Sequence, residues 1–93
     1  MALEFEWDDR KAKENLRKHG VSFHEAGTVL GDPLSMTYHD PDHSLAEHRY
    51  VTIGTSLSGR VLVVTHTERG DSVRIISARR ATRHERKHHE EAG

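Results

Sequence analysis

The sequence contains no cysteine and no long apolar segment. Without cysteine, the chain cannot form disulfides, bind zinc through thiolates or use a cysteine nucleophile. No apolar run comes near the roughly 20 residues that a helix needs to span a bilayer. The first nine residues, MALEFEWDD, lack the basic and apolar regions of a signal peptide. These absences predict a cytoplasmic protein with no membrane association.

Large apolar side chains and net charge are both scarce. Leucine, isoleucine, valine and phenylalanine make up 19 of the 93 residues, close to the level of about one-fifth that is typical of disordered chains. Disorder also requires a large net charge, whereas the formal net charge here is −1. The apolar residues fall in short, patterned runs. We therefore expect residues 1–93 to fold as one polar domain with a modest core.

The small net charge conceals an asymmetry between the two halves of the chain. Residues 1–48 carry five Lys and Arg against ten Asp and Glu, whereas residues 49–89 carry nine against three. The resulting charges are −5 and +6. A basic half on a neutral protein indicates an anion-binding face, for which nucleic acid is the first candidate. The alternative is that these cations only solvate strand and helix surfaces.

Capping patterns mark two helices near the start of the chain. Asp8 or Asp9 is placed to cap a helix that continues to about Lys18. Acidic residues at its start and basic residues at its end suit the helix dipole. Gly20 is placed to end this helix in a left-handed conformation. The sequence Ser-Phe-His-Glu at 22–25 then fits a capping box, which predicts a second, short helix.

Alternation with a period of two marks the strands. At 3–7, apolar residues alternate with acidic ones, as in a short half-buried strand. A further strand is predicted at 34–38. Three stronger signals follow at 49–55, 60–67 and 72–78, separated by loops short enough for hairpins. These three segments predict an antiparallel meander.

Together these elements predict an α+β fold: an antiparallel sheet with two N-terminal helices on one face and a short polar C-terminal helix at its edge. The last helix is predicted over 83–91, from a capping box formed by Thr82 and Glu85. It contains no apolar side chain. Such a helix gains little from packing on its own core. We therefore expect this helix either to fray or to be held by RNA, a partner protein or a charge network.

Arginines gather on the last strand and on the helix that follows it. If the strand continues to Arg80, then Arg74 and Arg80 share one face of the sheet and Arg79 takes the other. Three cations of the helix stand at i, i+3 and i+4 and form one stripe: Arg83, Arg86 and Lys87. Guanidinium groups bind phosphate bidentately, so this cluster predicts contacts to a nucleic-acid backbone.

Two histidine patterns resemble metal-binding motifs. Residues 84–88, HERKH, match the H-E-x-x-H pattern of zinc proteases, but no room remains for the usual downstream third ligand. His39, His43 and His48 flank an acidic loop that offers no closed four-ligand arrangement. We therefore predict no metal site and no cofactor. A zinc hydrolase remains an alternative, which metal analysis would settle.

Several sequence segments occur in a fixed order along the chain: FEWD at 5–8, NLRKHGVSF at 15–23, GDP at 31–33, RYVTIG at 49–54, VTHTER at 64–69, RIISARRAT at 74–82 and ER at 85–86. Together they resemble the BrnT family. The resemblance spans nearly the whole chain, which makes it far more specific than any single motif. One difference is at His89, where many relatives carry a tyrosine near the end of the last helix.

The resemblance implies a ribonuclease toxin of a type II toxin–antitoxin pair, with a RelE-like fold. It also implies a BrnA-like antitoxin that carries a ribbon-helix-helix domain and forms a hetero-oligomer with the toxin, expected to be 2:2. In this family the complex represses its own operon, so the toxin reaches operator DNA only through the antitoxin. A non-catalytic module that binds a partner or operator DNA is the alternative.

Metal-independent RNA cleavage requires a base for the 2′-OH, cations for the phosphorane and an acid for the leaving oxygen. We assign phosphate stabilisation to Arg79 and Arg69. The base and the acid are expected among His66, His19 and Glu85. The residues predicted to bind RNA are Lys18, Arg74, Arg80, Arg83 and Arg86, with Lys18 also a possible proton donor. The predicted outcome is blocked translation.

Overall fold

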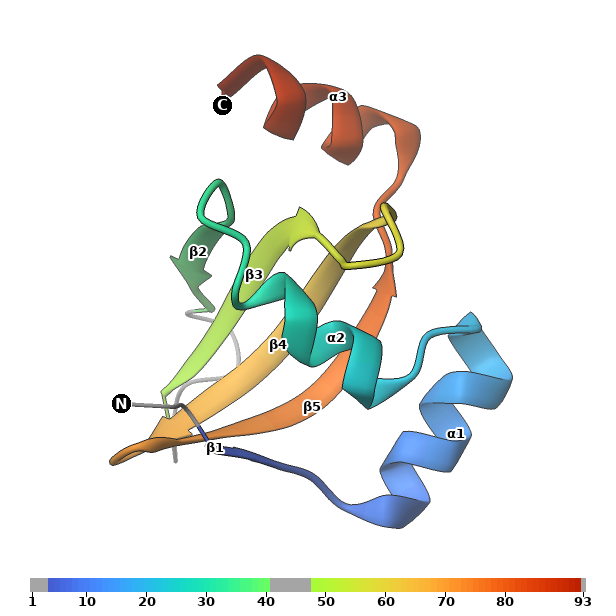
Figure 1. The fold of residues 1–93 in the computed structure, drawn as a ribbon, viewed down its shortest axis with the longest axis vertical. Helices are drawn as coiled ribbons and strands as arrows, with labels where there is room; N and C mark the ends of the chain where they lie inside the picture. The colour runs from blue at the N-terminus through green and yellow to red at the C-terminus, as the bar shows by residue number, and fades with distance from the viewer. Residues whose placement is uncertain (1–3, 41–47, 93) are drawn as a thin grey trace.

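The computed structural model describes residues 4–40 and 48–92 (Figure 1). Its elements, in chain order, are β1 (Glu4–Glu6), α1 (Asp9–His19), α2 (Phe23–Val29), β2 (Met36–His39), β3 (Arg49–Thr55), β4 (Val61–Arg69), β5 (Ser72–Arg80) and α3 (Arg83–Ala92). The α+β class and the order of elements agree with the prediction. No helix in the described ranges is long and apolar enough to cross a membrane.

The sheet is mixed, with the strand order β1-β5-β4-β3-β2. Strands β3 to β5 form the predicted antiparallel meander, and β2 adds to it by pairing with β3 in antiparallel fashion, but β1 pairs with β5 in parallel. The prediction of a purely antiparallel sheet is therefore wrong. Alternating apolar residues show that a strand is half-buried, but not the direction of its partner. Here β1 and β5 are separated by most of the chain, and a long connection allows two strands to run the same way.

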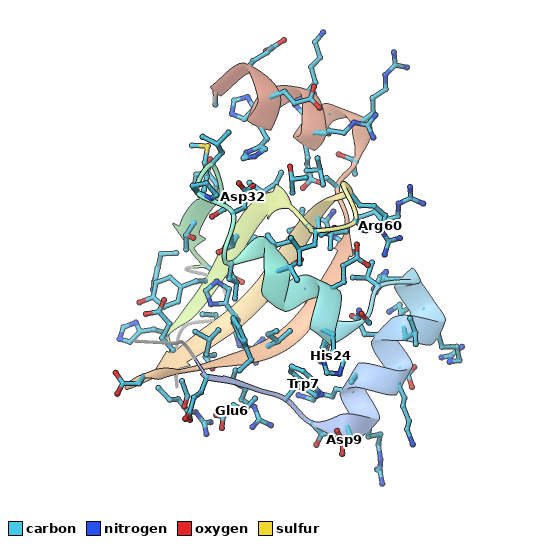
Figure 2. The ribbon with its side chains drawn as sticks, in the orientation of Figure 1. Glu6, Trp7, Asp9, His24, Asp32 and Arg60 are labelled. Carbon is cyan, nitrogen blue, oxygen red and sulfur yellow. The ribbon has the colours of Figure 1, made fainter. Side chains whose placement is uncertain are left out.

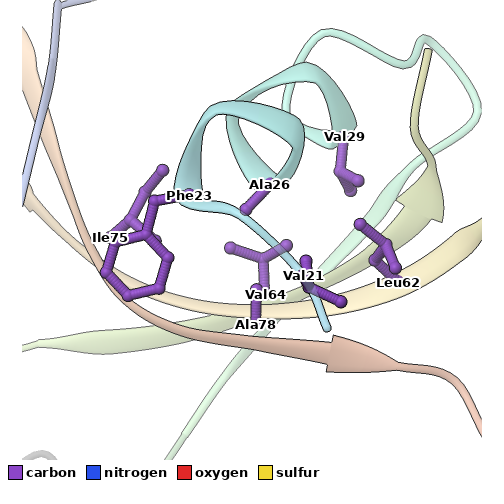
Figure 3. Packing of buried hydrophobic residues seen from close by; sticks show 8 residues of the cluster. All are labelled: Val21, Phe23, Ala26, Val29, Leu62, Val64, Ile75 and Ala78. Atoms are coloured by element: carbon purple, nitrogen blue, oxygen red, sulfur yellow. The ribbon is translucent and has the colours of Figure 1, made fainter. Parts of the chain in front are cut away.

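One face of the sheet is covered by α2, and the hydrophobic core lies between them (Figures 1 and 3). The core residues come from α2 and the segment just before it, and from β4 and β5: Val21, Phe23, Ala26, Val29, Leu62, Val64, Ile75 and Ala78. Trp7 and Ala12 pack against this cluster from the side of α1. The core is small and is centred on the short helix that the capping pattern predicted.

Helix α1 lies along the edge of the sheet beside β5, not on the face with α2 (Figure 1). β1 has only three residues, so β5 has no strand partner on that side beyond Arg74. The buried Asn15 side chain takes the place of a strand partner. Its Nδ2 donates to the Ala78 carbonyl at 2.8 Å, and its Oδ1 accepts from the Ala78 amide at 3.1 Å. The prediction that both helices lie on one face is therefore wrong for α1. This helix lies at the edge because the unpaired backbone groups of β5 need hydrogen-bond partners there.

The caps of α1 form as predicted, whereas that of α2 forms only in part. Asp8 accepts from the Lys11 amide, and Gly20 adopts a left-handed conformation with φ of 69°. At α2, Ser22 accepts from the Glu25 amide, but the Glu25 carboxylate does not return to the helix start as a capping box requires. It binds Arg60 instead, and this guanidinium is the stronger partner for a carboxylate.

Glu25 joins three parts of the fold together with Arg60, which lies between β3 and β4 (Figure 2). The Glu25 carboxylate also accepts from the hydroxyls of Ser56 and Ser58 in the β3–β4 turn, and Arg60 donates to the Gly20 carbonyl at the end of α1 at 3.1 Å. Chiefly through its hydrogen bond with Arg60, this environment lowers the pKa of Glu25 from 4.5 to about 2. The pair is partly buried, so solvent screens it less than a surface pair.

Replacing Glu25 with glutamine is expected to lower the free energy of unfolding by about 2 kcal/mol at pH 7, because the pKa of a stabilised carboxylate lies lower in the folded chain than in the unfolded one. The stabilisation is present above the unfolded pKa and disappears as the pH falls through the folded value. The difference between wild type and Glu25→Gln should therefore shrink between pH 4.5 and about 2. Urea unfolding across this range measures it, with the exposed Glu14→Gln as control. A constant difference would show that ionisation of Glu25 does not stabilise the fold.

Candidate active site at the end of β5

A hydrogen-bonded cluster of charged side chains lies where β5 passes into α3. Arg79 binds Glu85 through two parallel hydrogen bonds, Nη1 to Oε1 at 2.8 Å and Nη2 to Oε2 at 2.9 Å. Glu85 also closes the predicted capping box: its Oε1 accepts from the Thr82 amide at 2.9 Å, and its amide donates to Thr82 Oγ1 at 3.1 Å. The start of α3 and the Arg79 guanidinium thus hold each other in place.

The ionisation state of Glu85 determines whether it can transfer protons. Its hydrogen bonds with Arg79 are the main reason that the pKa of Glu85 is lowered from 4.5 to about 2. At neutral pH the carboxylate is therefore charged and a weak base, so it is suited to orienting Arg79 and poorly suited to transferring protons. The Arg79 side chain is still 43% exposed and can reach a ligand.

A β-bulge changes which arginines share a face. Thr65 pairs with Ser77, but the next residue of β4, His66, pairs with Ile75, so β5 contains one extra residue at this point. The extra residue reverses the alternation of side chains between the two faces. Arg74 and Arg79, five positions apart, therefore lie on the same face of the sheet. The prediction that Arg74 shares a face with Arg80 is wrong, because an inserted residue reverses the alternation on one side of it.

The end of α1 lies beside the same end of β5. Asn15 binds the backbone of Ala78, the residue before Arg79, and α1 runs in the same direction as β5 (Figure 1). His19 follows Asn15 by one helical turn, about 6 Å along the axis. Lys18 is exposed and His19 is half-buried. The structure thus gathers Lys18 and His19 at the end of the sheet that carries Arg79.

Helix α3 has a cationic outer side and a polar inner side. The predicted stripe of Arg83, Arg86 and Lys87 is exposed, as is Arg80 at the end of β5. Within residues 4–40 and 48–92, no carboxylate lies at ion-pair distance from these four cations. The inner side carries His89, which is only 7% exposed. None of the described core residues lies on α3, and the Arg79–Glu85 pair holds its start, which agrees with the expectation that a charge network supports this helix.

His66 lies apart from this cluster. It is 3% exposed on the face that α2 covers, its Nε2 is 2.8 Å from Thr52 Oγ1, and its ring stacks on Tyr50. Burial lowers the pKa of His66. Because Arg79 lies on the other face, the structure does not bring the two together.

Arg69 is also distant from Arg79. It pairs with Ser72 at the first residue of β5, whereas Arg79 lies seven residues further along that strand. At about 3.3 Å per residue, the separation along the strand is roughly 23 Å. Arg69 lies 4.0 Å from Glu6. The two arginines that the sequence assigned to one phosphate therefore lie at opposite ends of the sheet.

The histidine motifs do not assemble a metal site in the part of the chain that the structure describes. No group of three His, Asp or Glu side chains that could hold a metal ion occurs there. In the HERKH segment, Glu85 would have to act as a free base, but it is bound to Arg79. His43, of the acidic loop, lies outside the described residues.

The sequence prediction missed a groove between α3 and the face of the sheet opposite α2. Its floor consists of Val51, Ile53 and Val63, and its remaining walls consist of Tyr38, Glu85, His88 and His89. Its volume is about 280 Å³. The available signal was the run of four consecutive apolar residues at 61–64 in β4, which places apolar side chains on both faces of the sheet, although helices were predicted to cover only one face.

The family model described as "Ribonuclease toxin, BrnT, of type II toxin-antitoxin system" matches residues 7–85. The chain belongs to the BrnT family. It is therefore the toxin of a toxin–antitoxin system, with ribonuclease activity as the family's function, RNA as target and an antitoxin as partner. The matched segment contains Lys18, His19, Arg79 and Glu85, and it ends before the second half of α3.

A structural comparison supports the same fold. The crystal structure of the Brucella abortus ribonuclease toxin BrnT is similar to this BrnT-family chain, with a TM-score of 0.65 and 24% sequence identity. The match covers 88% of this chain and 100% of that one. A search of curated protein sequences found no match. The structural likeness establishes the fold, and the family match establishes the class of toxin.

Proposed function

We propose that this BrnT-family toxin is a metal-independent endoribonuclease that cleaves RNA through attack of the 2′-OH and thereby blocks translation in the cytoplasm. The observation that carries the proposal is the Arg79–Glu85 pair, oriented by two hydrogen bonds and partly exposed at the end of β5. Lys18 and His19 lie at the same end of the sheet. We assign the fold to the RelE-like class.

In this mechanism Arg79 stabilises the phosphorane. Its guanidinium is held in one orientation before substrate binds, so little reorganisation is needed when negative charge develops on the phosphate oxygens. Glu85 acts as a positioning residue, since its carboxylate binds both terminal nitrogens of Arg79. This assignment replaces the proton-transfer role that the sequence suggested for Glu85.

His19 and Lys18 take the proton-transfer roles. A histidine side chain both accepts and donates protons near neutral pH, which suits a base for the 2′-OH or an acid for the leaving 5′-oxygen. Lys18 supplies the second proton or a further positive charge. His66 lies on the opposite face of the sheet and Arg69 at its opposite end, and we assign neither a part in the reacting centre.

The exposed cations around the site bind the RNA backbone. Arg80, Arg83 and Arg86 are exposed and are not engaged by carboxylates of the described residues. They surround the start of α3, where the phosphate site lies, and guanidinium groups suit bidentate phosphate contacts. Arg74 extends the same basic face along β5.

The partner in the proposed complex is a BrnA-like antitoxin with a ribbon-helix-helix domain, in a 2:2 assembly that binds operator DNA through the antitoxin. Inhibition follows if an acidic surface of the antitoxin covers the cations of α3. Antitoxin and RNA would then compete for Arg83 and Arg86, and ionic strength would weaken both interactions.

Purified toxin without antitoxin is expected to cleave RNA at an unchanged rate in EDTA, because side chains perform every step of this mechanism. The products should carry 2′,3′-cyclic phosphates, since the 2′-oxygen attacks the neighbouring phosphorus. Gel analysis and mass spectrometry of the fragments measure both. Activity that is lost in EDTA and restored by zinc would revive the H-E-x-x-H alternative. A folded toxin that binds its antitoxin but leaves RNA intact would support the non-catalytic binding module.

A further inference from the structure

We infer that the groove between α3 and the sheet is a nucleobase subsite, which holds the base of a nucleotide next to the phosphate bound by Arg79. The inference rests on the proposed cleavage of RNA, and it adds a recognition site for the substrate. Its ligand class is a purine or pyrimidine base attached to a phosphate.

The floor of the groove suits the flat face of a base. Val51 and Ile53 of β3 and Val63 of β4 form this apolar surface, and Tyr38 of β2 borders it with a side chain that is 48% exposed. Bases bind proteins by stacking on apolar and aromatic side chains, which is tolerant of sequence because every base has a π-face. A volume of about 280 Å³ suits a ligand the size of one base better than a large organic molecule.

The inner wall carries an unused polar atom. The His89 side chain is buried, with only 7% of the residue exposed, and its Nδ1 has no hydrogen-bond partner among the described residues. A buried polar atom without a partner is costly, and such atoms in folded proteins usually have a function or a ligand. In this structure the nitrogen is closed off from the groove, so the donors and acceptors on the edge of a base pair with it only once the imidazole ring turns toward the groove. An aliphatic side chain could fill the groove but would leave Nδ1 unpaired.

The groove is continuous with the phosphate site. Glu85, which binds Arg79, lines one end of it, and His89 lines it one helical turn further along α3, about 6 Å away. A nucleotide whose phosphate contacts Arg79 can therefore place its base over Ile53. Stacking, one polar contact and a neighbouring cation together distinguish a nucleotide from a purely apolar ligand.

The test uses the full chain and a 2′-O-methyl RNA tetranucleotide, which lacks the 2′-OH and cannot be cleaved. It is compared with four versions, each lacking one base. Loss of one particular base should weaken binding roughly 10- to 100-fold, the range expected for one stacked base. In NMR spectra, the Ile53 methyl and His89 ring signals should shift when the intact probe is added. They should not shift with the abasic version that binds most weakly.

Two variants and a control sharpen the result. His89→Phe retains the bulk of the wall but removes the nitrogen, and it should bind the intact probe about tenfold more weakly. Ile53→Phe should fill the floor and reduce binding to the abasic level. Leu57→Ala, at a turn residue that is 89% exposed, is the control and should bind normally.

Three results would overturn the inference. Equal affinity, within twofold, for the intact probe and all abasic versions would show that no base is held. Ile53 and His89 signals that stay in place with the intact probe would show that the groove is not occupied. Signals that move only when antitoxin is added would show that it is a protein-docking site. Cleavage is measured separately on ordinary RNA, so failure of the proposed ribonuclease activity and failure of the base subsite give different outcomes.

Discussion

Replacement of Arg79 with alanine is expected to lower the rate of RNA cleavage by about 10²–10³-fold, because it removes an oriented donor from the developing charge of the phosphorane. The affinity for antitoxin and the secondary structure should change little, since Arg79 lies outside the hydrophobic core. Single-turnover cleavage of RNA measures the rate. Growth after expression without antitoxin provides the cellular readout, with arrest by wild type and normal growth with Arg79→Ala.

Two further variants separate a positioned charge from general electrostatics. Arg10→Ala removes an exposed arginine at the start of α1, away from the site, and should retain nearly full activity. Glu85→Gln leaves Arg79 in place with a weaker partner, so its loss should be smaller than that of Arg79→Ala. A similar loss for Arg10→Ala and Arg79→Ala would show that net charge, not orientation, supports catalysis.

Asn15→Ala is expected to destabilise the folded chain by about 3 kcal/mol, which for a domain of this size corresponds to a fall in Tm of roughly 12–24 °C. The buried amide of Asn15 binds the Val21 carbonyl at 3.0 Å and both backbone groups of Ala78. Alanine would leave the Ala78 amide and two carbonyls without partners. Thermal and urea unfolding measure the loss.

Lys13→Ala, on the same helix but exposed, is the matched control and should change stability by less than about 0.5 kcal/mol. Asn15→Asp keeps an acceptor for the Ala78 amide but places a carboxylate beside two carbonyl oxygens, so it should be at least as harmful as alanine. If Asn15→Ala were no more harmful than Lys13→Ala, the contact between α1 and the edge of β5 would contribute little to stability.

Residues that act through local contacts were predicted well from the sequence. The caps at Asp8 and Gly20 and the reciprocal box of Thr82 and Glu85 form as the patterns indicated. These interactions join residues within a few positions of each other, so their geometry follows from the helix itself. Arg79 and Glu85 also lie only six positions apart, across one turn between a strand and a helix.

Longer-range relations were predicted less well. Arg69 and Arg79 occur in one basic half of the chain, yet a nine-residue strand places them at opposite ends of the sheet. The capping pattern at Ser22 assigned Glu25 to its own helix, whereas Arg60, 35 residues later, binds its carboxylate. Competition between a local amide and a distant guanidinium cannot be seen until the chain is folded.

The sequence by itself determined the α+β class, the order of the elements, the basic C-terminal half and the resemblance to BrnT toxins, because these depend on local patterning and on segments in a fixed order. Tertiary structure alone decided the parallel pairing of β1, the edge position of α1, the separation of His66 from Arg79 and the groove beneath α3. The direction of a distant strand and one inserted residue at a bulge determine which side chains meet, and period-2 and capping patterns carry no information on either.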